Sequence, residues 1–194
     1  PPRSTLFPYT TLFRSSSWKS EKLDLDADLA RARQKLSALI NSNELDMSAF
    51  FKRDNKLLLY HGWADAALPA MNTIDYYDKL RGRHGEAASL RSRLFMAPGM
   101  GHCQSGDAPN IFGNNDLEAN TISPDDPERD ALAAVQAWVE AGRVPTQLIA
   151  TQFQGNDSKA AKLRDRPLCV YPQVAQYKGS GDPNAASSFS CVNP

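Results

Sequence analysis

The stretch LFMAPGMGHC, residues 94–103, carries the strongest structural signal in the chain. Its apolar first half predicts a buried strand, and Pro98 and Gly99 end that strand. His102 then lies on a turn, with a glycine directly before it. A histidine held at the end of a strand is typical of proton transfer, because an imidazole titrates near neutral pH.

A second stretch of the same design, LLLYHGWAD, lies upstream at residues 57–65. Its apolar run, residues 57–60, does not alternate with polar residues, as expected of a strand buried on both faces in a parallel sheet. The loop that follows this run carries a carboxylate, Asp65. Between the two predicted strands, apolar residues recur at helical spacing over residues 68–80, and residues 90–96 form the second strand.

A strand, a helix and a strand in this order form a crossover unit, which sets the two strands parallel. The loops that carry Asp65 and His102 must then leave the same edge of the sheet. In open parallel sheets this carboxyl edge is where ligands bind. We therefore expect an α/β fold with a mainly parallel sheet flanked by helices, and we expect Asp65 and His102 to lie close together.

The other elements follow from the same kinds of periodicity. Residues 24–40 predict an amphipathic helix, and residues 104–123 predict a long loop. Asp126 and Pro127 predict the N-cap and first turn of a further helix, which Gly142 ends. A strand or extended edge is expected over residues 146–153, and turn-rich coil is expected over residues 167–194.

Composition bears on the partners of the chain. Its 194 residues hold 22 Lys and Arg against 22 Asp and Glu, so no net charge gathers nucleic acid or anionic lipid. No apolar stretch approaches the roughly 20 residues that span a bilayer. We therefore expect no nucleic-acid partner and no membrane partner.

Residues 1–15 have no initiator Met and no clear period, and they resemble a translated adaptor sequence, so we set them aside as a non-native leader.

The three cysteines, Cys103, Cys169 and Cys191, indicate disulfide chemistry. A bond from Cys169 to Cys191 would restrict the unfolded chain by about 3 kcal/mol and would tether a tail with little apolar content. Such use of cysteine implies an oxidising compartment. The alternative is three free thiols in a cytosolic protein. No zinc site is expected, because the spacings lack the close Cys or His pairs that zinc requires.

Asp65 and His102 are the candidate acid and base of a hydrolase triad. Acyl transfer by a serine needs a base that accepts the hydroxyl proton and a carboxylate that holds the imidazole tautomer. Each of the two motifs, taken alone, is also compatible with a structural turn. The serine turn Gly-x-Ser-x-Gly, which α/β hydrolases place before the acid and the histidine, does not occur in the sequence. We therefore interpret the chain as the back half of an enzyme.

Three more side chains near these motifs have competing interpretations. His61 is expected to end its strand and to hydrogen-bond backbone atoms. His84 is expected to be a solvated surface histidine. Trp63 either lines a pocket for an aromatic ester or packs beneath its loop.

Four segments resemble the C-terminal part of the tannase and feruloyl esterase family: residues 57–65, 98–103, 133–140 and 166–169. The resemblance implies a secreted or periplasmic α/β hydrolase that cleaves esters of phenolic acids such as gallate or ferulate, with relatives that act on terephthalate monoesters. Members of the family carry one cysteine directly before the catalytic serine and another directly after the catalytic histidine, and the two are bridged.

Carried over to this sequence, the resemblance makes Asp65 the triad acid and His102 the base. It makes Cys103 one half of a bridge whose other half lies outside the chain. The family also implies a large lid that often holds calcium, so no cofactor is expected in this chain itself. The expected partners are a small aromatic ester and the missing N-terminal half of the same enzyme, without which the isolated chain should be inactive.

We expect three segments: a leader over residues 1–15, the return of the lid and a linking helix over 16–50, and the C-terminal part of the hydrolase domain with a disulfide-tethered tail over 51–194. One rival interpretation is another α/β hydrolase, such as a peptidase or lipase. Cys103, directly after the histidine, argues against it. The other rival is a non-catalytic secreted binding module in which Asp65 and His102 are structural.

Overall fold

The computed structural model describes residues 19–102, 105–114 and 125–194. The chain divides into two compact units, residues 1–44 and residues 45–194. The described residues of the first unit include a 3-10 helix, η2 (Ser20–Lys22), and the α-helix α2 (Leu25–Ile40). Asp24 is the N-cap of α2, because its Oδ1 accepts a hydrogen bond from the N–H of Ala27 at 2.9 Å. The helix predicted over residues 24–40 is therefore confirmed.

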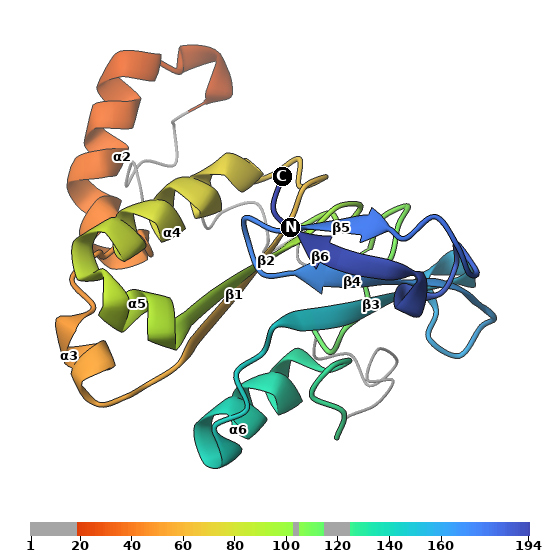
Figure 1. The fold of residues 1–194 in the computed structure, drawn as a ribbon. Coiled ribbons are helices and arrows are strands. Elements are labelled where there is room, and N and C mark those ends of the chain that lie inside the picture. The colour runs from red at the N-terminus through yellow and green to blue at the C-terminus, as the bar shows by residue number, and fades with distance from the viewer. Residues whose placement is uncertain (1–18, 103–104, 115–124) are drawn as a thin grey trace. The chain divides into compact units, whose positions relative to one another are not determined.

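The second unit is built around two parallel strands, β1 (Leu57–Gly62) and β2 (Ser92–Ala97). They pair in register, with Leu57 opposite Ser92 and Gly62 opposite Ala97, and they run side by side in Figure 1. The short helix α3 (Ser48–Lys52) precedes β1. The predicted crossover unit and the parallel pairing are confirmed.

The connection between the two strands contains two helices where the sequence predicted one. Helix α4 (Ala70–His84) runs through Gly82, and α5 (Glu86–Arg91) follows it directly. Gly85 separates them with a φ of 54°, a backbone conformation that favours glycine. Residues 90 and 91 were expected in the strand, but they belong to α5, because residues 86–91 are mostly good helix formers.

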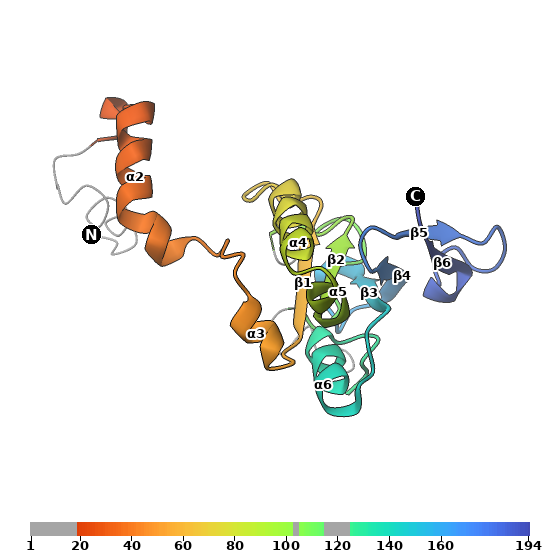
Figure 2. The same cartoon turned by 60° about the vertical axis from the view of Figure 1, so that its left-hand side comes forward.

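Side chains of β1 and β2 are packed on both faces. Leu59 and Leu94 pack with Ile74 and Tyr77 of α4. On the other face, Phe95 belongs to a core cluster that also contains residues of α6 (Ala131–Ala141). Figure 2 shows α4 and α6 on opposite sides of the two strands. Residues 57–60 are thus packed on both faces, as the absence of alternation predicted, but they are half-buried and not fully buried.

Helix α6 begins later than the sequence indicated. Its N-cap is Asp130, whose Oδ1 accepts from the N–H of Ala133 at 2.8 Å, and not Asp126. Asp126 instead closes a preceding turn, in which its carbonyl accepts from the N–H of Asp130. Both aspartates are good caps, so the local pattern did not distinguish them. Gly142 ends the helix in the left-handed conformation, as predicted.

The C-terminal region contains four antiparallel strands and two 3-10 helices: β3 (Gln147–Phe153), η4 (Gln154–Asn156), β4 (Lys162–Cys169), β5 (Val174–Tyr177), η5 (Ala186–Ser188) and β6 (Phe189–Val192). Strand β3 pairs with β4, and β5 pairs with β6. The strand expected over 146–153 is present. The coil expected over 167–194 is wrong, because β5 and β6 pair with each other in a segment whose polar, turn-rich composition conceals its strands.

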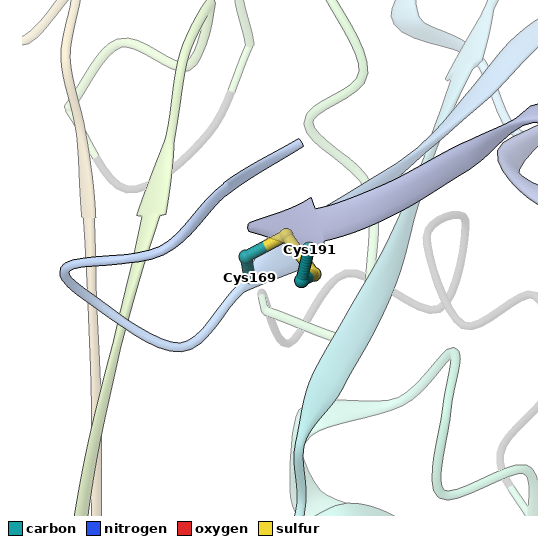
Figure 3. Close-up of a disulfide and its surroundings, with 2 residues drawn as sticks. All are labelled: Cys169 and Cys191. Atoms are coloured by element: carbon teal, nitrogen blue, oxygen red, sulfur yellow. A yellow bond between two sulfur atoms is a disulfide. The ribbon is translucent and has the colours of Figure 1, made fainter. Parts of the chain in front are cut away.

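Cys169 at the end of β4 and Cys191 in β6 are joined by a disulfide, with a Cα–Cα distance of 5.6 Å (Figure 3). The residues that follow β4 also join the edge of β2, where the N–H of Tyr171 donates to the carbonyl of Leu94 at 2.8 Å. The tail is thus tied to the strand that leads to His102. Among the described residues, no helix has the length and apolar character needed to cross a membrane.

Candidate active site

The loops after β1 and β2 are hydrogen-bonded to each other, and this positions the candidate acid and base. The N–H of Trp63 donates to the carbonyl of Ala97 at 2.9 Å, and the N–H of Ala64 donates to the carbonyl of Met100 at 3.1 Å. The pairing of the two strands therefore continues into their loops. Asp65 follows directly, so its backbone position is set by the histidine loop.

Gly62 permits this close approach. A Cβ atom at this position would collide with the carbonyl oxygens of Met100 and Gly101. A side chain here would push the two loops apart. The glycine of the His-Gly pair at residues 61 and 62 is therefore required by the contact between the loops.

Met100 anchors the histidine loop in the core. Its side chain is fully buried in the cluster that contains Phe95 and Phe112. One residue later, the N–H of Gly101 donates to the carbonyl of Ser105 at 2.9 Å, so the loop folds back on itself. His102 therefore follows directly after two residues, Met100 and Gly101, that are held in place.

The structure brings Asp65 and His102 together as the sequence predicted. Nδ1 of His102 lies 2.8 Å from Oδ2 of Asp65, which is hydrogen-bonding distance. The Asp65 side chain is only 3% exposed, whereas the His102 side chain is 53% exposed. The carboxylate is therefore enclosed while the imidazole remains accessible from outside.

Hydrogen bonds hold Asp65 in its ionised form. The backbone N–H of Leu68 donates to Oδ1 at 2.9 Å, and the N–H of Ala67 donates to the same oxygen at 2.8 Å. Together with His102, and with Leu68 as the largest contribution, these donors lower the pKa of Asp65 from 3.8 to about 2, against the effect of burial. Asp65 is consequently a carboxylate at any pH near neutrality.

His61 takes part in this site, which the sequence interpretation missed. Its Nε2 lies 3.2 Å from the carbonyl oxygen of Leu68, in line with the expected backbone contact. The same Nε2 also lies 3.2 Å from Oδ2 of Asp65, and Nδ1 lies 2.6 Å from Oγ1 of Thr73 in α4. The spacing of four residues between His61 and Asp65 was the available signal, but only the turn at residues 62–65 brings the two side chains together.

His84 lies away from Asp65 and His102, against the segment that precedes α3. Its Nε2 is 2.8 Å from the carbonyl oxygen of Leu45 and 3.2 Å from the N–H nitrogen of Met47. Its ring packs edge-on against Phe51. The expectation of a solvated surface histidine is wrong, because the end of α4 packs on this apolar segment.

Two cavities lie at the carboxyl ends of β1 and β2. A cavity of about 180 Å³ is lined by His61, Asp65, Thr73 and His102, among others. Another, of about 240 Å³, is lined by Trp63 and by Met96, Pro98 and Tyr171, among others. Trp63 is 46% exposed and so lines a pocket instead of lying buried beneath its loop.

The remaining predicted site residues are the cysteines. Cys169 and Cys191 are bonded to each other, as expected. Cys103 lies outside the described residues. Within the described part of the chain, no group of three or more His, Cys, Asp or Glu side chains is arranged to hold a metal ion.

Comparison with known proteins matches this arrangement to one family. The family described as tannase and feruloyl esterase matches residues 8–192. The chain is 41% identical over 150 residues to a mono(2-hydroxyethyl) terephthalate hydrolase of Piscinibacter sakaiensis, covering 77% of this chain and 22% of the relative. It is 34% identical over 198 residues to an uncharacterized esterase of Xanthomonas campestris pv. campestris, covering 92% of this chain and 34% of the relative.

The structure is also similar to a solved family member, feruloyl esterase B of Aspergillus oryzae. The TM-score is 0.80 at 26% identity, over 95% of this chain and 36% of that one. The chain therefore spans about a third or less of the length of these relatives, and it has the fold of the matching part of an α/β hydrolase. With a family match over nearly its whole length, the chain belongs to the tannase and feruloyl esterase family.

Proposed function

We propose that the chain supplies the acid, Asp65, and the base, His102, of a Ser-His-Asp triad in a serine carboxylesterase that hydrolyses esters of phenolic or other aromatic acids. The observation that carries this proposal is the 2.8 Å contact between Oδ2 of Asp65 and Nδ1 of His102 at the carboxyl ends of two parallel strands. A carboxylate in this position holds the imidazole tautomer and stabilises the imidazolium that forms during the reaction.

Each group then has a defined task. Because Nδ1 of His102 faces Asp65, Nε2 is the nitrogen that accepts the proton of the serine hydroxyl as the hydroxyl attacks the ester carbonyl. Nε2 returns this proton to the alcohol as the bond between the acyl carbon and the alcohol oxygen breaks. It then takes a proton from water as the water oxygen attacks the acyl carbon, and returns that proton to the serine oxygen as the bond between the acyl carbon and the serine breaks and the acid leaves.

The serine and the oxyanion donors come, in this proposal, from an upstream part of the same protein. The sequence has no Gly-x-Ser-x-Gly turn, and the matched relatives are about three times as long or longer. The chemistry uses protein groups alone. Any calcium would belong to the lid that the family resemblance implies, outside this chain.

The names of the relatives and the Trp63 pocket support an aromatic substrate. One relative is a terephthalate monoester hydrolase and another is a feruloyl esterase. The indole of Trp63 offers a flat apolar surface on which an aromatic acyl group can stack. The disulfide supports a secreted or periplasmic location, because such bonds persist in oxidising compartments.

A chimera tests this function. In it, this chain replaces the matching segment of the Piscinibacter sakaiensis terephthalate hydrolase, and hydrolysis of methyl ferulate, methyl gallate and mono(2-hydroxyethyl) terephthalate is measured. We expect turnover of at least one ester, and His102→Ala or Asp65→Asn in the chimera should lower kcat by about 10⁴-fold. The isolated chain should not exceed the buffer rate, since it lacks a nucleophile.

His84→Ala in the same chimera is the control, because His84 lies away from the candidate acid and base. It should leave kcat within about threefold of the parent value, since it removes no transition-state contact. A chimera that retains its activity after His102→Ala would contradict the proposal. Turnover by the isolated chain that depends on His102 would also contradict it and would require a nucleophile within these 194 residues.

A further inference from the structure

We propose that His61 is a positioning residue that holds the Asp65 carboxylate in the orientation His102 needs, and that Thr73 fixes the His61 ring for this task. The role rests on the proposed function of Asp65 and His102 as acid and base. Nε2 of His61 and Nδ1 of His102 both contact the same oxygen, Oδ2 of Asp65, at 3.2 and 2.8 Å.

The backbone fixes the Asp65 carboxylate only in part. Its Oδ1 is anchored by the backbone N–H groups of Ala67 and Leu68. These two bonds hold one oxygen, but the carboxylate plane can still turn about that anchor, and Oδ2 would move with it. His102 is a poor reference for Oδ2, because its side chain is 53% exposed, whereas the His61 side chain is only 11% exposed.

The neighbours of His61 indicate which of its ring nitrogens carries the proton. Its Nε2 faces two acceptors, the carbonyl oxygen of Leu68 and the carboxylate oxygen of Asp65, each at 3.2 Å. The contact with the Leu68 carbonyl has hydrogen-bond geometry, and it requires a proton on Nε2, because a carbonyl oxygen can only accept. The close approach of the same Nε2 to the negative Oδ2 of Asp65 is favourable in this form too. Nδ1 then accepts a hydrogen bond from the hydroxyl of Thr73, whose oxygen is 2.6 Å away. The geometry therefore assigns the Nε2–H tautomer to His61.

The contact of His61 with Asp65 also affects His102, the candidate base. Oδ2 of Asp65 is hydrogen-bonded to Nδ1 of His102, and the N–H edge of His61, 3.2 Å from the same oxygen, attracts its negative charge. With His61 in place, Oδ2 stays opposite Nδ1 of His102 and selects the His102 tautomer that leaves Nε2 free to accept a proton. Without His61, the carboxylate plane turns, the two tautomers of His102 become mixed, and part of the population presents a protonated Nε2 to the serine.

The test measures the ring nitrogens directly and needs no esterase activity. The chain has three histidines, so ¹⁵N chemical shifts from long-range ¹H–¹⁵N spectra at about pH 8, where an ordinary imidazole is neutral, report all six nitrogens. We expect a protonated Nε2 on His61 and a protonated Nδ1 on His102. In His61→Phe, the two nitrogen shifts of His102 should move toward each other, which signals a mixture of tautomers.

A pair of substitutions at Thr73 keeps the test decisive if His61→Phe does not fold. Thr73→Val removes the hydroxyl at nearly constant size and should mix the tautomers of His61, and in part those of His102. Thr73→Ser keeps the hydroxyl and should restore both signals. The control is His84→Phe, which replaces a partly buried histidine outside this contact set and should leave the His102 signals unchanged.

Two results would overturn the inference. One is a His61 in the unaltered chain whose Nε2 carries no proton. The other is a His102 whose nitrogen shifts are the same in the unaltered chain, in His61→Phe and in Thr73→Val. Neither result depends on whether the chimera hydrolyses esters, so a failure of the positioning role is distinguishable from a failure of the proposed function.

Discussion

The corner that carries Asp65 and His102 and the tail formed by β5 and β6 are held in place in different ways. In the corner, β1 and β2 are packed on both faces, and backbone hydrogen bonds continue from the strands into the two loops. In the tail, every residue of β5 is exposed and β6 has no buried residue. A disulfide links the tail to β4.

The difference shows where each kind of stabilisation is effective. A site that needs a fixed distance between two side chains is built where close packing leaves the backbone little freedom. A segment with few apolar side chains buries too little surface to offset the loss of chain entropy on folding, and a covalent link reduces that loss. The corner should therefore respond to changes in packing, and the tail should respond to reduction.

The largest expected effect is on the corner. Phe95→Ala removes a fully buried side chain from the core cluster and should lower the free energy of unfolding by about 4 kcal/mol. Phe189→Ala in the tail removes a partly exposed ring that packs on Arg166 and Tyr177, and it should cost about 1 kcal/mol. Urea denaturation of both variants measures the two values. Equal costs would contradict the contrast between the two regions.

The next effect is on the tail. Replacing both Cys169 and Cys191 by serine should lower the free energy of unfolding by about 3 kcal/mol, because a closed loop of 22 residues is opened in the unfolded chain. Amide hydrogen exchange should increase in β5 and β6 while β1 and β2 stay protected. The unaltered chain in a reducing agent should behave like the double variant. A uniform increase of exchange in all strands would show that the tail and the corner unfold as one unit.

A pair of glycine substitutions sharpens the comparison within the corner. Gly62→Ala should lower the free energy of unfolding by about 2 kcal/mol, because its Cβ collides with the backbone of residues 100 and 101. Gly82→Ala in α4 should raise it by about 1 kcal/mol, since the new Cβ has no atom within 4 Å and alanine favours the helix. Chemical denaturation gives both signs, and a neutral Gly62→Ala would mean that the two loops are not held in contact.

The smallest effect appears only at low pH. The folded state lowers the pKa of Asp65 to about 2, so it binds this proton less readily than the unfolded chain does. The resulting stability is fully present above about pH 4 and is lost as the pH falls toward about 2. Compared with Asp65→Asn, the unaltered chain should lose this part of its stability within that window and not above about pH 5. Urea denaturation at a series of pH values tests this, and a difference that stays constant down to pH 2 would refute it.

Several features of the fold and the site were predictable because they have local causes. The parallel pair β1 and β2 followed from apolar runs and helical spacing, and the contact of Asp65 with His102 followed from that parallel arrangement, which puts both loops at the same edge of the sheet. The start of α6 did not, because Asp126 and Asp130 are equally suitable caps. Strands β5 and β6 did not, because they are short and exposed and lie in a Gly-, Pro- and Ser-rich tail without a strand periodicity.

The sequence by itself determined that two apolar strands end in loops bearing Asp65 and His102, since a strand, a helix and a strand in this order set the two strands parallel and put both loops at one edge of the sheet. Only the tertiary structure decided that Gly62 lets the two loops touch, that His61 reaches the Asp65 carboxylate, and that Thr73 contacts the His61 ring. The physical reason is distance. Periodicity reports which face of an element is buried, whereas a hydrogen bond requires atoms from separate elements to lie within about 3 Å.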